Sequence, residues 1–312
     1  MKIGDDKNET KKETNFTLMA LFLVIFGSIF YFLEPSQANP NTPTPTPEIV
    51  QANQEIQDGE KLQIWFLDVG QADSILIQNG DANMLIDAGN NEDGKKLVSY
   101  FQSLGIETFQ YVIGTHAHED HIGGMDDIID NFDIDTFYMP DAITTTATFE
   151  SVLDSLEAKN IAFQTPSIDS IFKLGNATID VLYVGTDDSD LNNTSIVLKL
   201  TYGNTSILFM GDAEKEVETI IEKKDISADV LKVGHHGSNT SSSKTFLEKV
   251  NPNYAIINVG TGNSYGHPSN TTIQNLENQN IQIYRTDENG TIIMTSDGTD
   301  ITFQTIQTNT NG

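Results

Sequence analysis

The chain has 312 residues, of which 17 are basic and 45 acidic, giving a formal net charge of −28 at pH 7, and it contains no cysteine. The lack of cysteine excludes disulfides and thiolate metal sites, so any metal ion must be bound by histidine and carboxylate side chains. The acidic surplus is the opposite of the basic footprint of a nucleic-acid-binding domain.

The N-terminus predicts a short polar tail followed by an apolar segment. Residues 1–15 are polar and end near the pair Lys11-Lys12, and residues 16–33 are an uncharged apolar run, FTLMALFLVIFGSIFYFL. This run is at the lower limit for a membrane-spanning helix and is long for the core of a signal peptide. The basic pair before it favours a cytoplasmic N-terminus. We therefore expect a transmembrane anchor or a signal segment here.

A linker separates this segment from the folded part of the chain. Residues 34–60 alternate proline with threonine and then become polar, which is typical of a stiff tether. Residues 61–312 are expected to form one domain. Its predicted location is the extracellular face of the membrane, either anchored through the N-terminal segment or secreted.

Apolar runs bounded by turn residues predict the elements of this domain. The first half is expected to contain, in chain order, strands Leu62–Leu67, Ser74–Ile77 and Ala82–Asp87, helix Lys95–Leu104, strand Tyr111–Gly114, a helix after His121 and helix Ala147–Lys159. The second half is expected to contain strands Ala177–Val184, Ser195–Tyr202 and Thr205–Met210, helix Glu214–Lys223, strand Val230–Val233, helix Ser243–Val250, strand Tyr254–Ile257, helix Thr271–Asn278 and strands Gln282–Tyr284, Thr291–Met294 and Ile301–Phe303. Two β-rich halves, each followed by helices, predict an α+β fold, a four-layer αββα sandwich.

The motif with the strongest chemical content directly follows strand Tyr111–Gly114. It contains His116, His118, Asp120 and His121 within six residues. Two histidines at positions i and i+2 of an extended segment project to the same side, so both imidazoles can reach one cation. Asp120 and His121 then lie at the turn into a helix, where they can face a second cation. Imidazole and carboxylate ligands suit zinc, manganese or iron.

Three later segments repeat the order of a strand followed by a polar side chain. Asp212 follows strand Thr205–Met210, and the pair His235-His236 follows strand Val230–Val233. His267 lies in the later segment Tyr-Gly-His-Pro. A lone Gly-Asp is a weak signal, because it also forms ordinary turns. All six histidines of the chain fall in these motifs, which favours metal and proton chemistry.

These motifs resemble a known family. The order FLDVGQADSILI, LIDAG, THAHEDHIGG, NNTSIVLKL, ILFMGDAE, ADVLKVGHHGS and SYGHP…YRTD, over residues 62 to 297, is similar to the metallo-β-lactamase superfamily. It most resembles the hydrolase domain attached to ComEC-type DNA-uptake proteins and its stand-alone relatives. The resemblance carries over the hydrolase module, not the transport channel.

The resemblance implies two divalent metal ions, with zinc preferred and manganese or iron as alternatives. It implies as metal ligands His116, His118, Asp120, His121, Asp212 and one of the 235/236 pair. We prefer His236 as the ligand and His235 as a substrate contact. The chain departs from many members in having no histidine between the first motif and Asp212. The segment Asn192–Ser195 stands there instead, so Asn193 or water is expected to complete the coordination of one metal ion.

The reaction implied is hydrolysis of a phosphoester or phosphodiester, with nucleic acid among the candidate substrates, by a hydroxide held between two metals. Asp120 would orient the hydroxide, and His235 and His267 would stabilise developing charge or protonate the leaving group. The predicted substrate contacts are Asn193, Ser238 and Arg285. Arg285 is the single arginine of the chain, and a structural salt bridge is the alternative role for it.

The sequence leaves two other functions open. The same site would polarise the carbonyl of an ester, thioester or lactone, and the domain could also be a non-catalytic metal-binding surface module. Residues 1–60 hold 4 basic and 9 acidic residues, which leaves 13 basic and 36 acidic residues, a net charge near −23, in residues 61–312. This charge favours a short substrate, or high salt, over long polyanions at low salt. No protein partner can be inferred.

Overall fold

The computed structural model describes residues 61–307, except for residues 143 and 187–188. The predicted tail, apolar segment and linker of residues 1–60 lie outside the described residues, so their roles stay predictions. Within the described ranges, no helix is long and apolar enough to cross a membrane.

The first half of the described chain alternates strands with helices. Its elements are β1 (Leu62–Phe66), β2 (Ser74–Asn79), β3 (Ala82–Ala88), α1 (Gly94–Ser103), β4 (Thr108–Ile113), α2 (Glu119–Ile122), α3 (Met125–Asn131), β5 (Asp133–Tyr138), α4 (Ala147–Lys159), β6 (Phe163–Gln164) and β7 (Ile171–Leu174). The second half contains β8 (Ala177–Tyr183), β9 (Val197–Tyr202), β10 (Thr205–Phe209), α5 (Lys215–Ile221), β11 (Val230–Lys232), α6 (Lys244–Val250), β12 (Tyr254–Ile257), α7 (Asn270–Glu277), β13 (Gln282–Arg285), α8 (Thr286–Asn289), β14 (Thr291–Ser296) and β15 (Ile301–Ile306). Short 3₁₀ turns at Asn192–Thr194 and Gly234–Gly237 lie between them.

The strands form two mixed sheets. One has eight strands in the order β15-β14-β1-β2-β3-β4-β5-β6, and the other has seven in the order β13-β12-β11-β10-β9-β8-β7. The last two strands of the chain therefore return to the first sheet, where β14 pairs antiparallel with β1. In the centre of the sheets β3 runs parallel to β4, and β10, β11 and β12 run parallel to one another.

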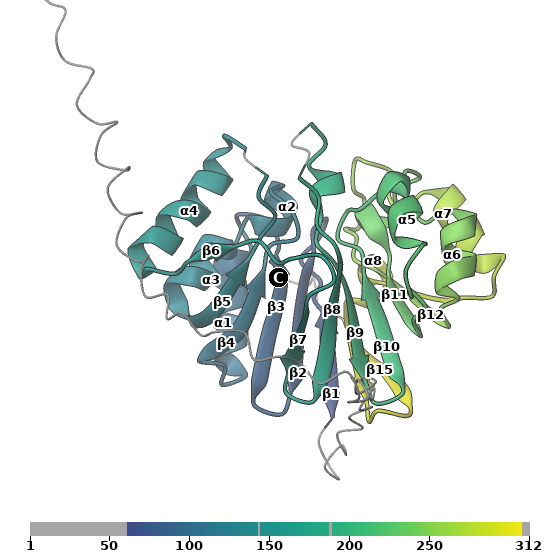
Figure 1. Cartoon of the computed structure of the whole chain (residues 1–312), viewed down its shortest axis with the longest axis horizontal. Coiled ribbons are helices and arrows are strands. Elements are labelled where there is room, and N and C mark those ends of the chain that lie inside the picture. Colours follow the sequence, from purple (N-terminus) through teal and green to yellow (C-terminus); the bar gives the residue numbers. More distant parts are fainter. Residues whose placement is uncertain (1–60, 143, 187–188, 308–312) are drawn as a thin grey trace, which may run out of the picture. The chain divides into compact units, whose positions relative to one another are not determined.

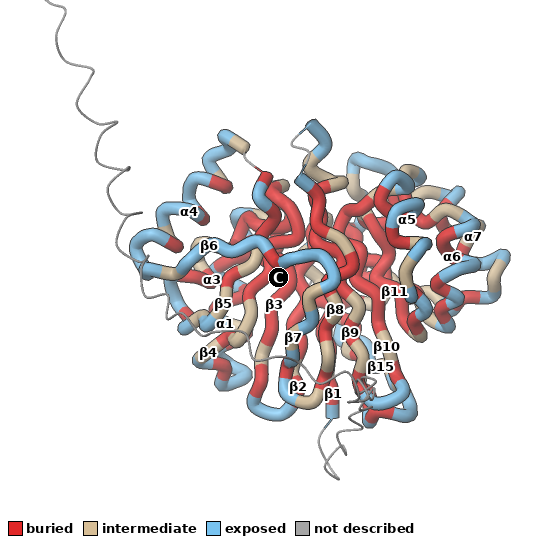
Figure 2. Tube along the Cα trace, in the orientation of Figure 1, coloured by how far each residue is buried: buried red, intermediate tan, exposed pale blue. Residues whose placement is uncertain are grey.

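Apolar side chains between the layers hold them together. The core between the two sheets includes Phe66, Leu198 and Phe209, all at most 2% exposed. A second cluster lies between the first sheet and helices α1, α3 and α4, and a third lies between the second sheet and helices α5, α6 and α7. The helices cover the outer faces of the sheets (Figure 1), and the buried positions follow the strands and the inner sides of the helices (Figure 2). The predicted α+β sandwich with four αββα layers is confirmed.

Most of the predicted elements are present, and α4 and β12 have the predicted bounds. The strands missing from the prediction are β5, β6 and β7. They lie at or next to the edges of the sheets, and many of their residues are exposed. Such strands lack the continuous apolar pattern of central strands, so their pairing partners decide their structure.

Candidate metal centre and active site

The candidate ligands all follow the carboxyl ends of central strands. The segment from His116 to His121 follows β4, Asp212 follows β10, and His235-His236 follows β11. Parallel neighbours end at the same edge of a sheet, so each sheet brings its ligand loops together. Loops of the two sheets also meet: His121 Nε2 lies 3.3 Å from Asp212 Oδ2.

The two glycines after His121 allow the first ligand loop to pack closely. A Cβ atom at Gly123 would lie 2.2 Å from the backbone nitrogen of Asn91, and one at Gly124 would lie 2.6 Å from the carbonyl oxygen of Ala88. Because no side chain fits, glycine lets α2 and α3 pack against the loop that follows β3. This contact holds Asp120 and His121 at their place in the site.

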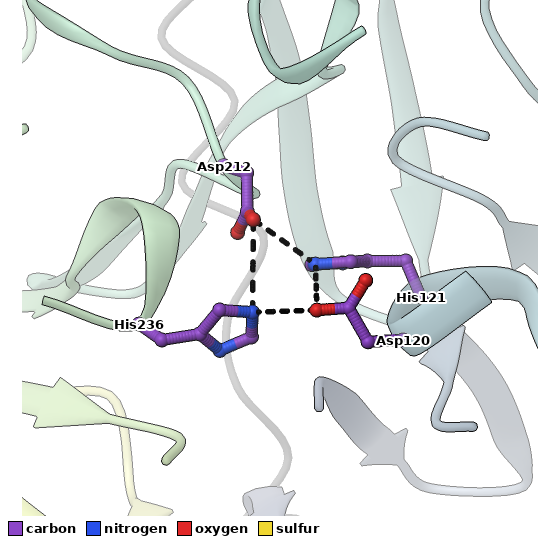
Figure 3. A group of neighbouring side chains, drawn as sticks. All are labelled: Asp120, His121, Asp212 and His236. Carbon is purple, nitrogen blue, oxygen red and sulfur yellow. Dashed lines mark ion pairs between the residues drawn. The ribbon is translucent and has the colours of Figure 1, made fainter. Parts of the chain in front are cut away.

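Four side chains form the centre of the site, namely Asp120, His121, Asp212 and His236 (Figure 3). Each offers one ligand atom, and these atoms all lie within 4.8 Å of one another. The Asp212 Oδ2 atom is 3.3 Å from His121 Nε2 and 3.6 Å from His236 Nε2, and Asp120 Oδ2 is 3.3 Å from His236 Nε2. The Nε2 atoms of both histidines are buried and make no hydrogen bond. Buried nitrogen atoms aimed at carboxylates in this way fit a divalent cation.

Each of these histidines is oriented through its other ring nitrogen. The Nδ1 atom of His121 lies 2.7 Å from Asp87 Oδ2, and Asp87 in turn accepts from the Thr115 N–H at 2.7 Å. The Nδ1 atom of His236 lies 2.9 Å from the carbonyl oxygen of Asn258. A carboxylate or carbonyl at Nδ1 selects the tautomer with Nε2 free, as metal-ligating histidines require.

His116 and His118 form a second group beside the first. His116 Nε2 lies 3.0 Å from His118 Nδ1 and 4.0 Å from Asp212 Oδ2. The structure thus brings all six predicted ligands to one place, with Asp212 between the two groups. It places His236, rather than His235, in the four-residue cluster. That these residues bind metal stays a prediction.

The charges around the cluster favour a cation at its centre. Burial opposes ionisation of Asp212, but the positive charges of His121 and His236 outweigh it and hold the pKa of Asp212 well below its usual value. Burial also opposes a charge on His121, but Asp212, Asp87 and Asp120 raise its pKa well above the usual value. The carboxylates therefore attract positive charge to this point, which a proton supplies when no metal ion does.

His116 has the opposite electrostatics. Burial, together with the charge of His121, lowers the pKa of His116 well below its usual value. The imidazole of His116 is therefore neutral at physiological pH, and only a neutral imidazole can donate a lone pair to a metal.

Three of the eight non-glycine residues with positive φ angles in the described part of the chain lie in or beside the cluster. Asp87, His235 and His236 have positive φ angles of 60°, 49° and 49°. Residues other than glycine adopt the left-handed backbone region at a cost of about 1–3 kcal/mol each. Asn160 and Asn251 also have positive φ, but they end helices, where asparagine is common. His235 and His236 lie in the 3₁₀ turn Gly234–Gly237, so this strained turn sets the direction of both imidazoles.

A cavity of about 430 Å³ opens next to the cluster. Among the predicted residues, its lining includes His118, Asp120, Asp212, His235, His236 and His267. His235 is oriented by Glu214, whose Oε1 atom lies 2.9 Å from Nδ1, and its Nε2 atom lies 3.9 Å from Asp212 Oδ2. The ring centroids of His235 and His267 are 5.4 Å apart. Burial, with the nearby charges of His235 and His236, lowers the pKa of His267, so its imidazole is neutral at neutral pH.

The predicted substrate contacts lie elsewhere. The Asn193 amide donates to Asp190 and accepts from the Glu214 N–H, whereas Asn192 lines the cavity with a buried Oδ1 atom that makes no hydrogen bond. Of the two asparagines, Asn192 is thus the one that faces the cavity.

Ser238 and Arg285 are likewise outside the lining of the cavity. Ser238 is 4% exposed, and its Oγ atom accepts from Thr240. Arg285 binds Asp287 at 2.6 Å and Glu288 at 2.9 Å, so both of its terminal nitrogens have partners. This position agrees with the alternative role of Arg285 in a structural salt bridge, because Asp287 and Glu288 already neutralise the guanidinium.

A buried ion pair lies directly behind the cluster. Lys232 Nζ is 2.7 Å from Asp73 Oδ2, and both side chains are 1% exposed. The other carboxylate oxygen of Asp73 lies 3.4 Å from His236 Nδ1. The backbone N–H of Asp73 donates to the Asp120 carbonyl oxygen. The pair therefore joins the segments that carry Asp120 and His236. Sequence reasoning did not assign a role to Lys232, Asp73, Asp87 or Glu214, although all four lie in the quoted motifs.

Comparison with known proteins gives the family. The model of the Metallo-beta-lactamase superfamily matches residues 67–260. This chain belongs to that superfamily. It is 31% identical over 253 residues to ComE operon protein 3 of Bacillus subtilis (strain 168), covering 74% of this chain and 32% of that protein. It is 26% identical over 233 residues to Competence protein ComA of Neisseria gonorrhoeae, covering 73% and 31%.

The solved structure of YhfI from Bacillus subtilis, a metallo-beta-lactamase fold protein, matches with a TM-score of 0.50 at 14% identity, covering 72% of this chain and 95% of that one. This likeness concerns the fold alone. The chain spans about a third of the length of the two curated relatives. Superfamily membership together with the His/Asp cluster identifies a metal-dependent hydrolase that uses divalent ions, and the resemblance seen in the sequence motifs is confirmed.

The neighbouring histidines 235 and 236 provide a matched test of the metal site. We expect His236→Ala to lower the metal bound per chain from about two equivalents to about one, because it removes a ligand of the cluster. His235→Ala should leave the metal content unchanged. Elemental analysis of the purified proteins after dialysis measures both. Equal losses in the two variants would contradict the assignment of His236.

The buried Lys232–Asp73 pair predicts a stability effect. Lys232→Met should lower the free energy of unfolding by about 3–5 kcal/mol, because it leaves the Asp73 carboxylate buried without its partner. Adding Asp73→Asn should restore more than half of the loss, since no unpaired charge then remains. Urea denaturation of the metal-free protein measures both. Lys244→Met, which removes an exposed pair with Glu248 at 3.6 Å, is the control and should have little effect. A similar small effect for Lys232→Met would refute the role of the pair.

Proposed function

We propose that this chain hydrolyses phosphodiesters, with short substrates preferred and nucleotides among them. The observation that carries the proposal is the placement of two imidazoles, His235 and His267, on the same cavity wall outside the cation cluster. A phosphodiester presents two non-bridging oxygens and a leaving-group oxygen, which gives both imidazoles a partner. A carbonyl ester presents one developing oxyanion and a leaving-group oxygen, so the phosphodiester offers one more acceptor, its second non-bridging oxygen, to the groups at this cavity. The similarity to a relative named Competence protein ComA adds support.

The chemistry that divalent cations supply when bound is activation of water and polarisation of the phosphoryl group. The chain's own residues would orient and protonate the reactants. Asp120, a carboxylate at the cavity, can accept a hydrogen bond from the attacking water and orient it. The neutral His267 can donate its N–H to a non-bridging oxygen. We propose zinc as the metal, with manganese or iron as alternatives, because the donors are imidazole and carboxylate.

We propose His235 as the proton donor to the leaving group. Glu214 accepts from Nδ1 and orients the ring, so that Nε2 lies on the cavity side. Thr240 also donates to Glu214, at 2.8 Å, and keeps its carboxylate in place. This arrangement gives a proton donor that is separate from the metal ligands.

The reaction can be tested on bis(p-nitrophenyl) phosphate with zinc or manganese supplied. We expect metal-dependent cleavage of this substrate. On a dinucleotide, whose alcohol leaving group needs a proton, we expect His235→Ala to lower kcat by about 100-fold, since positioned acid–base groups contribute factors of this size. Long single-stranded DNA should be cleaved poorly at low salt, where the acidic protein repels it. The rival substrates are a lactone and a thioester. Turnover of either by a metal-loaded protein that never cleaves a phosphodiester would favour carbonyl chemistry.

We also propose that the domain acts on the extracellular face. The support is the apolar run of residues 16–33 after a basic pair, which favours export of the domain on its C-terminal side. Protease added outside intact cells should digest or release the domain, while a cytoplasmic marker protein stays intact. Full protection of the domain would contradict this location.

A further inference from the structure

A single aromatic side chain stands exposed at the rim of the cavity. Tyr265 lines the cavity and is 72% exposed, the largest exposed fraction of any large apolar side chain in the described part of the chain. Large aromatic rings are usually buried, because burying them removes apolar area from water. An exposed ring beside a catalytic cavity therefore indicates contact with something that binds there.

The loop that carries Tyr265 is held in one conformation. The Oδ1 atom of Asn263 accepts from the backbone N–H groups of Tyr265 and His267, at 3.2 and 3.0 Å. Its amide nitrogen donates to the carbonyl oxygens of Gly260 and His267, at 3.0 and 2.6 Å. One asparagine side chain thus ties both ends of the loop together, so the ring of Tyr265 is presented at a defined place.

The same loop packs against a second loop at the cavity. A Cβ atom at Gly260 would lie 2.5 Å from the backbone nitrogen of Gln71, and the Gly260 N–H donates to Gln71 Oε1 at 3.1 Å. Gln71 also lines the cavity, and its Nε2 group makes no hydrogen bond with the described residues. A free amide donor therefore lies on the loop that supports the aromatic one.

The orientation of the Tyr265 ring suits stacking. It lies nearly parallel to the ring of His267, with 18° between the planes and 5.9 Å between the centroids. This arrangement places the ring beside the imidazole assigned to the phosphoryl oxygen. A flat group attached to the phosphodiester could lie against the exposed part of the Tyr265 ring while the phosphoryl group contacts His267.

The charge of the lining residues favours an uncharged contact of this kind. Among the described residues that line it there is no lysine or arginine, and Glu119, Asp120 and Asp212 are acidic. The basic contacts with which nuclease-like proteins hold a phosphate backbone are therefore missing. Stacking of a base on an aromatic side chain contributes about 1–3 kcal/mol without any charge.

We propose that Tyr265 is a specificity-determining residue that stacks on a nucleobase next to the scissile phosphodiester, with the Gln71 amide available to the base edge. This rests on the proposed phosphodiesterase function. Stacking on Tyr265 would select substrates that carry a planar ring within one nucleotide of the cleaved bond. It does not require a long polyanion, in agreement with the acidic surface.

The test compares the dinucleotide thymidylyl-thymidine with its abasic counterpart, using the full chain loaded with metal. Tyr265→Leu should lower the ratio of kcat/KM for the dinucleotide to kcat/KM for the abasic substrate by roughly tenfold, through KM. Tyr265→Trp should restore the ratio, since it supplies another stacking ring. Ile171→Ala, which changes an exposed apolar residue on β7, is the control and should leave the ratio unchanged.

Several outcomes would overturn the proposal. An unchanged ratio would remove the stacking contact, and a fall in kcat for both substrates would show that Tyr265 only positions His267. A KM effect on diphenyl phosphate but not on the dinucleotide would replace the nucleobase by another aryl group. If the wild-type protein cleaves none of these substrates, the proposed function fails. Calorimetric binding of thymidine 5′-monophosphate and of deoxyribose 5-phosphate then still tests stacking, because Tyr265→Leu should weaken only the first.

Discussion

One carboxylate oxygen joins the two halves of the site. Asp212 Oδ2 lies within 4.0 Å of the Nε2 atoms of four histidines, 116, 121, 235 and 236. Two of these follow a strand of the first sheet and two follow a strand of the second. The arrangement exists only when the sheets are packed face to face, so the apolar core between them is a condition for the chemistry.

The second constraint is the balance of buried charge. Asp73, Asp87 and Asp212 are each at most 2% exposed, and burying a carboxylate without compensation costs several kcal/mol. Lys232 compensates Asp73, and His121 lies against both Asp87 and Asp212. The remaining negative charge attracts cations to the centre of the site. A divalent cation bound there would offset this charge.

The surroundings of the metal centre decide which substrates it can serve. A fold shared by a superfamily does not fix the substrate, which depends on the residues around the site. In this chain the rim offers imidazole, amide and aromatic groups, and its charged members are acidic. Uncharged contacts at this rim support the proposed preference for small substrates with a flat group over long anionic chains.

The sequence by itself determined the elements of the fold and the ligand segments. The apolar pattern of strands such as β10 and β12, and the spacing of His116, His118, Asp120 and His121, are local properties that a few consecutive residues encode. The local sequence pattern did not predict strands β5, β6 and β7, where exposed residues replace the continuous apolar run.

Only the tertiary structure decided the contacts between distant segments. It paired β14 with β1, set Lys232 against Asp73, and placed His236 rather than His235 in the cluster. It also turned Asn192 rather than Asn193 toward the cavity. The physical reason is that neighbouring side chains of one type look alike in sequence. Which of them faces inward depends on backbone conformation, such as the positive φ angles of the histidine pair, and on how the two sheets pack.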